Sequence, residues 1–536
     1  MKENFAVTPD VVIVGAGPVG LMLAIELGLA GIRPIVLERL SEPSTEPKAN
    51  GLVGQIVPMI DRRGLYESLS GSKRPPQPNS SYFMFSALPL DLSRLEQSPV
   101  YNLPAPQQRI VQVLEQRAVE LGAEIRRGSE VVGLVAGDDT VTLRVSDATG
   151  MRTLHTRYLV GADGGRSAVR KLSGIDFPGV SYDGRITRTV HATVPAEWVD
   201  PGTGELVVPG YGRIRPFLPL RTETGGFSYA PFPGHPALVS TTEWQKPETE
   251  EPMTLADMRA SIGRVLGVDL PLAPPSGDGP HVLRRMVGGN TRVAAAFRNG
   301  RIFLAGDAAH VFANGGGPGL NVGLQDSMNL GWKLAAELHG RAPSGLLDSY
   351  EHERRSAARR TVMSSQAQSA LIAPGSDVTA LRELFTELLD DTATIGHLAE
   401  LIAGSDIRYA MGESAAHPLV GRCAPDLELI TAAGPVRLAE LTRTARPLLL
   451  DLTGDTTLAE VVAGWRDRVD VIAARPVAPD SGITGLLLRP DSYVAWASAT
   501  THPNAVERES LRAAMERWFG VGGVDREVRD TVGSVH

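Results

Sequence analysis

The strongest constraint on the fold lies within the first forty residues. An apolar run, Val11–Val14, is followed at once by a glycine-rich turn, an apolar helical stretch and a second short apolar run that ends at Glu38. Four apolar residues without alternation are typical of a parallel strand that is covered on both faces. The glycines have the spacing G-x-G-x-x-G, which is the fingerprint of a dinucleotide-binding turn when it lies between a strand and a helix.

The residues of this turn have separate physical roles. Gly15 permits the tight turn, Gly17 lets the backbone approach a pyrophosphate, and Gly20 lets the helix pack closely on the strand. The N-terminus of the helix then faces the anion. Glu38 is placed to accept hydrogen bonds from a ribose diol. The cofactor-binding candidates in this region are Gly15, Gly17, Pro18, Val19, Gly20, Glu38 and Arg39.

Length and composition narrow the class of protein. With 536 residues the chain exceeds one compact core, because cores stop growing near about 250–300 residues. A formal net charge of -8 argues against a general nucleic-acid binder. Cys423 is the only cysteine, which excludes a Cys-x-x-Cys redox pair and a cysteine-rich zinc site, and we expect no bound metal. No apolar run reaches the ~18 residues of a membrane span, and no secretion signal is apparent, so we expect a cytoplasmic protein without a membrane partner.

Three regions of the chain differ in pattern. From 179 to 280, aromatic-containing segments alternate as in an antiparallel sheet, and the nucleotide-type pattern resumes after 281. After 416, short apolar strands alternate with helices. The predicted domains are therefore 1–178 together with 281–400, an inserted sheet domain at 179–280, and a small α/β domain at 416–536.

Two later motifs resemble those of a known enzyme family. Residues 158–170 read YLVGADGGRSAVR and contain Asp163, and residues 300–310 read GRIFLAGDAAH and contain Asp307. They are similar to the Asp-Gly and Gly-Asp motifs of the para-hydroxybenzoate hydroxylase-like class A FAD monooxygenases, and the similarity continues through 315–354. The fold class that this resemblance implies is α/β: a Rossmann-like FAD-binding domain of the glutathione reductase type, an inserted antiparallel-sheet substrate domain and a C-terminal thioredoxin-like domain.

The resemblance implies which residues hold FAD. Asp307 would contact the ribityl chain, Asp163 would organise the pyrophosphate side and the nicotinamide path, and Gln107 would reach the flavin side. Residues 317–321 open a helix whose free amides can bind the pyrimidine edge of flavin, where negative charge develops on reduction. The further cofactor-binding candidates are Lys48, Gln107, Asp163, Asp307, Gly317, Pro318, Gly319, Leu320 and Asn321.

Three positions depart from the family pattern. Lys48 stands where arginine is common, Asn314 where proline is common beside the reactive flavin carbon, and Pro318 where glutamine is usual. Lysine keeps the charge of arginine but loses its bidentate fork. The departures weaken any transfer of detailed active-site geometry, and they leave the cofactor motifs intact.

The resemblance also implies the reaction. NADPH or NADH would dock transiently, so a second dinucleotide fingerprint is not needed, and reduced FAD would react with O2 to give a C4a-hydroperoxide that attacks an electron-rich phenol carbon. The sequence looks like the actinobacterial hydroxylases that tailor polycyclic aromatic polyketides in antibiotic biosynthesis. Baeyer–Villiger insertion, ring opening or rearrangement of the same substrates stays open, as does a protein that binds FAD or ligand without turnover. No catalytic base is assigned.

The substrate is expected to lie against the inserted sheet. The pocket candidates are aromatic and polar residues of this sheet, together with one residue of the glycine-rich loop: Tyr211, Arg215, Phe227, Tyr229, Trp244 and Asn314. The C-terminal region resembles the thioredoxin-like tail of phenol hydroxylase relatives but lacks Cys-x-x-Cys. A structural or dimerisation role is therefore expected for it, in a monomer or a homodimer.

Overall fold

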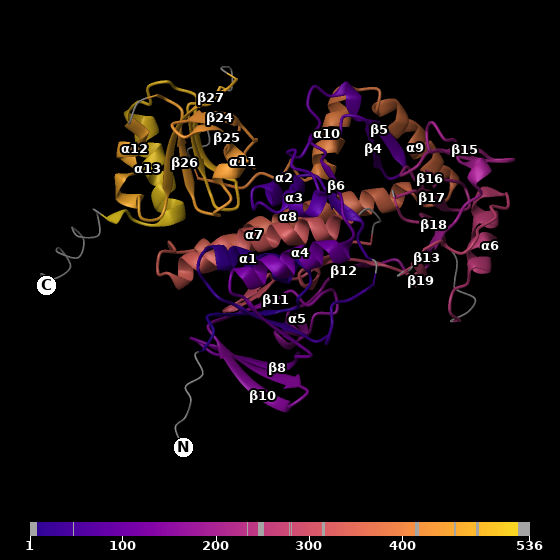
Figure 1. Ribbon diagram of the computed structural model, residues 1–536, viewed down its shortest axis with the longest axis horizontal. Helices are drawn as coiled ribbons and strands as arrows, with labels where there is room; N and C mark the ends of the chain where they lie inside the picture. Colours follow the sequence, from indigo (N-terminus) through magenta and orange to yellow (C-terminus); the bar gives the residue numbers. More distant parts are fainter. Residues whose placement is uncertain are drawn as a thin grey trace, which may run out of the picture.

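The computed structural model describes residues 8–46, 48–232, 234–244, 251–277, 279, 281–313, 317–412, 417–454, 457–478 and 482–523. Figure 1 shows three sheet-containing bodies: an N-terminal body at the centre and bottom, a middle body at the right and a C-terminal body at the upper left. Among the helices that the structure describes, none is both long and apolar enough to cross a bilayer.

A six-stranded sheet forms the centre of the N-terminal body. Five of its strands run parallel, with β1 between β11 and β2, and β21 closes one edge in the antiparallel sense. The inner strands are buried on both faces, which explains why they are apolar runs without alternation. In spatial order the strands are β21 (Arg298–Asn299), β22 (Ile302–Leu304), β11 (Tyr158–Gly161), β1 (Val11–Val14), β2 (Ile35–Glu38) and β7 (Glu124–Arg127).

Helices lie on one side of this sheet and an antiparallel three-stranded sheet lies on the other (Figure 1). The first helix, α1, packs against both α4 and α7. The elements of these two layers are α1 (Pro18–Leu29), α4 (Gln107–Glu120), α7 (Pro318–Leu338), β8 (Glu130–Ala136), β9 (Val141–Asp147) and β10 (Gly150–Thr156). Short elements complete the body: β3 (Gly51–Val53), α2 (Ile56–Asp61), α3 (Tyr66–Ser70), β6 (Asn102–Pro104) and α5 (Ala168–Leu172).

The middle body is an antiparallel sheet with one helix, α6 (Leu255–Leu266), packed on one of its faces. In spatial order its strands are β16 (Leu220–Arg221), β17 (Gly226–Ala230), β18 (Ala237–Trp244), β13 (Arg185–Ala192) and β19 (Leu283–Val287). The last strand lies beyond residue 280, so the predicted boundary falls short of the end of this sheet. A hairpin, β14 (Leu206–Val208) and β15 (Gly212–Ile214), extends from the same body.

A small three-stranded sheet joins the middle body to the loop that follows β22. It consists of β12 (Gly179–Ser181), β20 (Asn290–Val293) and β23 (His310–Val311). After α7 come three further helices, which pack with a hairpin from the N-terminal part. These elements are α8 (Leu346–Leu371), α9 (Ser376–Leu388), α10 (Thr392–Ala403), β4 (Tyr82–Phe85) and β5 (Leu88–Asp91).

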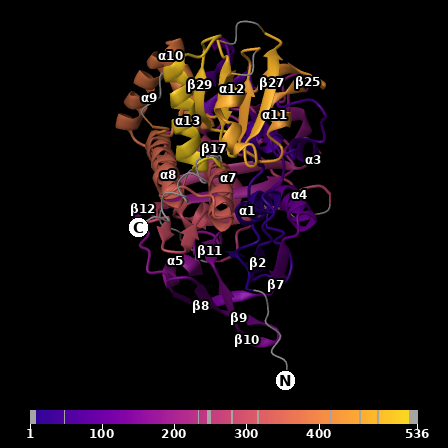
Figure 2. The ribbon, with the colours of Figure 1, turned by 90° about the vertical axis from the view of Figure 1, so that its left-hand side faces the viewer.

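The C-terminal body has a six-stranded mixed sheet, which lies opposite β8–β10 in the rotated view (Figure 2). A parallel βαβ unit is followed by an antiparallel ββα unit, and the thioredoxin-like assignment stays a prediction. In chain order the elements are β24 (Glu428–Thr431), β25 (Gly434–Arg437), α11 (Leu438–Leu441), β26 (Leu448–Asp451), α12 (Thr457–Val461), β27 (Asp470–Pro476), β28 (Gly485–Leu488), β29 (Val494–Ser498) and α13 (Ala505–Phe519).

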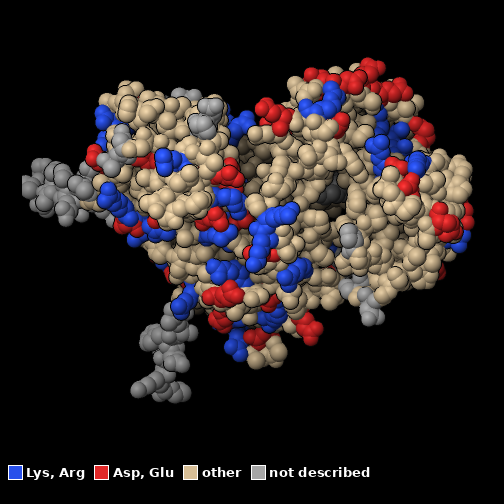
Figure 3. All heavy atoms as spheres, turned by 45° about the horizontal axis from the view of Figure 1, so that its top comes forward, with Lys and Arg blue, Asp and Glu red and all other residues tan. Residues whose placement is uncertain are grey.

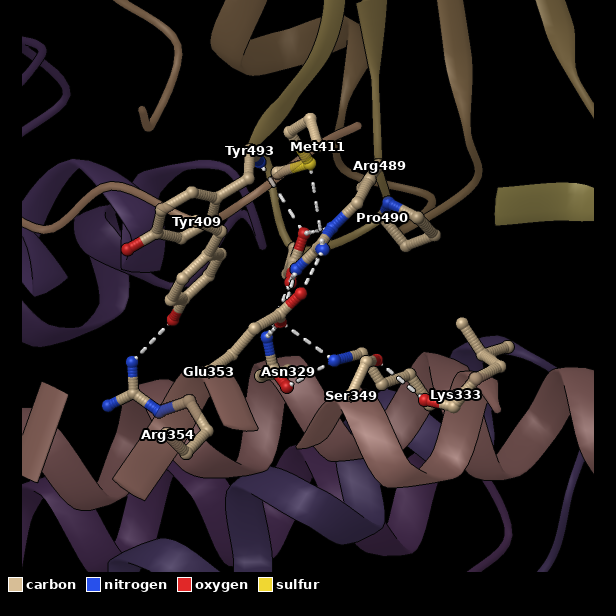
Figure 4. Close-up of polar contacts among 12 residues, drawn as sticks. Asn329, Lys333, Ser349, Glu353, Arg354, Tyr409, Met411, Arg489, Pro490 and Tyr493 are labelled. Atoms are coloured by element: carbon tan, nitrogen blue, oxygen red, sulfur yellow. Dashed lines mark hydrogen bonds and ion pairs between the residues drawn. The ribbon is translucent and has the colours of Figure 1, made fainter. Parts of the chain in front are cut away.

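A buried network of charges joins this C-terminal body to α7 and α8 (Figure 4). Arg489 donates two hydrogen bonds to Glu353, at 2.6 and 2.9 Å, and its Nε donates to Asp491 at 3.0 Å. Lys333 donates to the same Glu353 carboxylate at 2.7 Å, and Asn329 bridges Glu353 and Asp491. Two cations face two anions, and all five side chains are buried. Complete pairing of this kind is what makes buried charge tolerable.

Removing one member of this network should be costly. The Arg489→Met variant would leave two carboxylates buried without their shared cation, which typically costs about 3–5 kcal/mol. We expect its thermal unfolding midpoint to fall by several degrees. The matched control is Arg512→Met, because Arg512 forms an ion pair on the exposed face of α13 and such pairs contribute little. Equal midpoints for the two variants would contradict the prediction.

Glu353 also gives the network a defined pH dependence. Burial would raise the pKa of Glu353, but Arg489 and Lys333 outweigh burial and hold its pKa below the usual value. As pH falls through the usual glutamate pKa of about 4.3, the unfolded chain takes up a proton here and the folded chain does not, so the free energy of unfolding decreases.

The stability advantage of the wild-type chain over Glu353→Gln should therefore shrink as pH is lowered from about 6 to about 3.5. Thermal unfolding followed by circular dichroism at each pH measures this difference. A stability difference that stays constant over this range would be inconsistent with an ionised Glu353 in the folded state.

Candidate functional site

The glycines of the first turn are in the conformations that the sequence predicts. Gly15 has a φ of 109°, and a Cβ atom there would lie 2.4 Å from the carbonyl oxygen of Ala162. A Cβ at Gly20 would lie 2.0 Å from the oxygen of Gly15. Neither position tolerates a side chain. Gly17 differs, because, apart from its chain neighbours, no atom of the described residues lies within 4 Å of where its Cβ would be.

Gly17 begins α1, and no side chain caps this helix start. The first amides of a helix have no partner inside the helix, and the helix dipole adds positive potential at the same end. An open space in front of such amides is suited to an anion. The first turn therefore offers both the donors and the room that a pyrophosphate needs.

Glu38 ties this turn to the end of β2. Its two carboxylate oxygens accept hydrogen bonds from the amides of Ala16 and Leu40, each at 2.9 Å. A carboxylate can accept about four hydrogen bonds, so it has capacity left for a ribose diol. Arg39 follows it and is exposed.

The second loop that the sequence singles out follows β22. Its Asp307 is open to solvent, yet protein atoms surround it closely enough that burial raises the pKa of this carboxyl, an effect that His310 and Lys48 partly offset. Within the described part of the chain, no group donates a hydrogen bond to the Asp307 carboxylate. The Asp307 carboxylate is therefore an acceptor that is available to a ligand.

The two loops meet at a contact lined by glycine. The Val19 side chain lies 2.8 Å from the Cβ position of Gly306 and 2.7 Å from that of Gly323 in α7. The Ser327 hydroxyl donates to the Val19 carbonyl at 2.7 Å. The start of α1, the Asp307 loop and the first turns of α7 are thus packed directly on one another.

The start of α7 resembles that of α1 in being open. Gly317 has a left-handed conformation, with φ 70° and ψ 33°, and Pro318 occupies the first turn, where its missing amide costs nothing. A Cβ at Gly319 would lie 3.3 Å from the Asp307 carboxylate. Asn321 accepts a hydrogen bond from Val53 at 3.2 Å and so fixes β3. Leu320 packs against the main core.

One buried carboxylate holds the Asp307 loop in place. Asp326 accepts hydrogen bonds from the Gly306 amide at 2.9 Å and from His310 at 2.7 Å, and its second oxygen accepts from Arg354 at 2.7 Å. Burial would raise the pKa of Asp326, but His310 and Arg354 outweigh burial and lower it. His310 is therefore part of the scaffold. The sequence places Asp326 and Arg354 in the family motif without showing that they meet.

Two buried arginines hold the same loop by its carbonyl oxygens. Arg170 donates to Ala308 at 2.9 Å, and Arg185 donates to Ala313. The sequence analysis missed both roles. Arg170 ends the Asp163 motif, which was a usable signal, whereas Arg185 lies in the inserted sheet and no local pattern distinguishes it.

The remaining cofactor candidates organise their own loops. Asp163 accepts hydrogen bonds from the amides of Ala168 and Val169, at 2.7 and 3.1 Å, and so caps α5. Its other carboxylate oxygen is buried and has no partner among the described residues. Gln107 accepts a hydrogen bond from the Ala49 amide at 3.3 Å and thereby positions the chain next to Lys48.

The structure separates the substrate candidates of the inserted sheet. Phe227 and Tyr229 belong to the core beneath α6, with 1% and 2% of their surface exposed, so their assignment to a pocket is corrected. Tyr211 and Arg215 are exposed at the β14–β15 hairpin. Trp244 is half-buried at the end of β18, and Asn314 lies outside the described residues.

Comparison with known proteins identifies the family. Residues 8–365 match the FAD binding domain family, and residues 417–521 match the family described as aromatic-ring hydroxylase, C-terminal. The chain is 41% identical to the 12-dehydrotetracycline 5-monooxygenase/anhydrotetracycline 6-monooxygenase of Streptomyces rimosus, over 95% of this chain and 99% of that protein. It is 36% identical to a rifampicin monooxygenase of Streptomyces venezuelae, over 95% of this chain and 98% of that protein.

Solved structures agree with these matches. The anhydrotetracycline hydroxylase of Streptomyces rimosus superposes with a TM-score of 0.82 at 39% identity, over 96% of this chain and 99% of that chain. The α/β fold class expected from the sequence is confirmed. Because the matches span the FAD-binding part and the C-terminal part alike, the chain belongs to the FAD-dependent aromatic-ring hydroxylases, which are class A flavoprotein monooxygenases like para-hydroxybenzoate hydroxylase.

Proposed function

We propose that this FAD-dependent monooxygenase uses NADPH or NADH and O2 to hydroxylate a polycyclic aromatic polyketide. The observation that carries the assignment of the cofactor site is the pair of uncapped helix starts at Gly17 and Gly317. Asp307 lies on the loop that contacts both helices. These groups fit FAD, because they combine anion-binding amides with an unpaired carboxylate acceptor.

Each part of the cofactor has a group to hold it in this proposal. The amides of α1 around Gly17 bind the pyrophosphate, and Glu38 accepts hydrogen bonds from the adenosine ribose. Asp307 accepts from the ribityl hydroxyls, while the amides of residues 317–321 meet the pyrimidine edge of the ring. When bound, FAD supplies the transfer of electrons from the nicotinamide to O2.

The protein contributes orientation, water exclusion and electrostatics. Amides at the start of α7 stabilise negative charge on the reduced ring, because the helix dipole is positive at this end. The network around Asp326 keeps the loop that carries Asp307 from moving when the ring charge changes. Preorganised donors of this kind need no rearrangement during the reaction.

The substrate class rests on the relatives. Anhydrotetracycline and rifampicin, which appear in the names of two similar monooxygenases, are large oxygen-rich polyketides. Two similar solved structures are those of hydroxylases, one of anhydrotetracycline and one from angucycline biosynthesis, which favours hydroxylation over Baeyer–Villiger insertion. A substrate of this size needs an open site, and Figure 3 shows a hollow near the middle of the molecular surface, surrounded mostly by uncharged residues.

The direct test is aerobic incubation of the FAD-loaded protein with NADPH or NADH and anhydrotetracycline as the probe. We expect nicotinamide oxidation that depends on the probe and a product that gains one oxygen atom from isotopically labelled O2. The position of the label separates ring hydroxylation from ester insertion. Probe binding without nicotinamide consumption or gain of oxygen would instead support a binding protein.

The cofactor site itself is tested by Gly17→Val. Its φ of -77° suits any residue, and no described residue other than its chain neighbours lies within 4 Å of the new Cβ, so the chain should fold normally. The side chain would, however, fill the space proposed for the pyrophosphate. We expect FAD affinity to fall at least ~10-fold, which corresponds to ~1.4 kcal/mol, with the unfolding midpoint of the cofactor-free protein unchanged.

Fluorescence titration with FAD measures the affinity. Gly263→Ala is the matched control, because Gly263 in α6 also has open space at its Cβ position but lies in the middle body. Unchanged FAD binding by the Gly17→Val variant would rule out a pyrophosphate at this helix start.

A further inference from the structure

The two faces of the middle sheet differ sharply in chemistry. One face packs on α6 through apolar residues and the buried pair of Arg188 with Glu243. On the other face, strand register places side chains with hydroxyl groups directly opposite one another across β13, β18 and β17. We call this the hydroxyl face, which comprises Arg185, Thr187, Thr189, Ser228, Ser240, Thr242 and Trp244.

The hydroxyl face is directed at the FAD-binding body. Arg185 donates to Ala313 in the loop before α7. Arg284, which stands opposite Thr189 in the register, forms an ion pair with Glu46 at 3.6 Å. At the far edge, a Cβ atom on Gly226 would lie 3.9 Å from Ile372 at the end of α8. Three separate segments of the FAD-binding body thus surround this face.

The hydroxyl groups have unused capacity. Ser240 donates to Thr189 at 3.1 Å, and Thr187 lies 3.4 Å from Thr242. A hydroxyl can donate one hydrogen bond and accept two. Ser228, Ser240 and Thr242 are half-buried, so they still reach solvent. A row of such groups matches a ligand with oxygen atoms spaced along its edge.

Arg185 is the one member of the hydroxyl face that carries a charge. Only 9% of its surface is exposed, its Nε is buried without a partner in the described part of the chain, and its guanidinium lies 5.2 Å from the Tyr182 ring centre. No described carboxylate pairs with it, whereas Arg188 on the opposite face has Glu243. Burial lowers the pKa of Arg185, as it does that of the paired Arg188, so the contrast between the two arginines rests on their partners.

We infer that Arg185 binds an ionised oxygen of the substrate, an enolate or phenolate, while the hydroxyl face binds the other oxygens. This inference rests on the proposed function and narrows the substrate class to acidic, multiply oxygenated polycycles. The proton is released to water when the oxygen ionises. A guanidinium can bind such an oxyanion through a charge-assisted hydrogen bond, which favours the charged form.

Because Arg185 would bind an oxygen that is already ionised, the reaction would need no separate catalytic base. An ionised phenol or enol donates more electron density to its ring than the neutral form does, and this is what transfer of an electrophilic oxygen requires. Arg185 also holds Ala313, in the loop that leads to α7, so it would fix the position of the substrate relative to the proposed flavin site. Arg185 would thereby both orient the substrate and activate its ring.

The test uses alizarin, a hydroxyanthraquinone whose colour changes from yellow to red as it loses its first proton, with the FAD-loaded protein and no nicotinamide. We expect wild-type protein to bind the ionised dye and to lower its apparent pKa relative to the free dye. Arg185→Gln should bind it at least 10-fold more weakly, in the neutral form. Arg185→Lys should retain part of the pKa change, because it keeps the charge without the planar fork.

Arg213→Gln is the matched control, since Arg213 lies in the same body but is exposed and paired with Asp200; it should behave as the wild type. The flavin absorbance of each variant reports whether its site is intact. If wild-type protein does not bind alizarin, or binds only the neutral dye, the inference is overturned without any variant. An equal pKa change in wild-type protein and Arg185→Gln overturns it as well.

The dye experiment tests the role of Arg185, and the turnover assay tests the proposed function, so either claim can be contradicted without the other. Ionisation of bound alizarin that depends on Arg185, together with no probe-dependent oxidation of nicotinamide, would contradict the proposed function and support the role of Arg185. Turnover of the probe, together with dye ionisation that does not depend on Arg185, would support the proposed function and contradict the role of Arg185.

Discussion

The arrangement of the site depends on the buried carboxylate of Asp326. It accepts hydrogen bonds from the Gly306 amide and His310, in the loop after β22, and from Arg354 in α8, with α7 between these two segments in the chain. The loop that carries Asp307 packs Ala305, Ala308 and Ala309 into the main core and leaves the Asp307 carboxylate exposed. A charge-assisted anchor in a water-free core gives it a fixed position, because each of these bonds would leave a buried polar group unpaired if it opened.

The same anchor extends into the C-terminal body. Arg354 donates to the Tyr409 hydroxyl at 2.7 Å, and the Tyr409 ring stacks on Tyr493 at 4.1 Å between ring centres. Beside this path, Arg489 reaches Glu353, the residue before Arg354 in α8. The C-terminal body lacks a redox pair of cysteines, and these contacts give it a physical role: it clamps the two helices whose side chains support the Asp307 loop.

Local sequence patterns predicted the parts of the site that depend on local geometry. The spacing of Gly15, Gly17 and Gly20 predicted the first turn, in which Gly15 has a positive φ and its carbonyl oxygen leaves no room for a Cβ atom at Gly20. Alternation in the inserted sheet predicted which residues share a face but not which face α6 covers, so Phe227 and Tyr229 were assigned to the wrong side. Asp326 and Arg354 are 28 positions apart, and only the packing of α7 on α8 brings them together.

Charged side chains that hold the fold together are paired with an opposite charge, whereas those proposed to bind a ligand are not. Three buried ion pairs lie where one element packs on another: Arg489 with Glu353, Arg188 with Glu243, and Arg354 with Asp326. Arg185, which is buried, and Asp307, which is open to solvent, each lack a partner of opposite charge in direct contact among the described residues. An unpaired buried charge is costly in the free protein, and it is tolerated where a ligand supplies the missing partner. In the proposed function the anionic side chain would meet hydroxyl groups of the cofactor, and the cationic one would meet an acidic substrate.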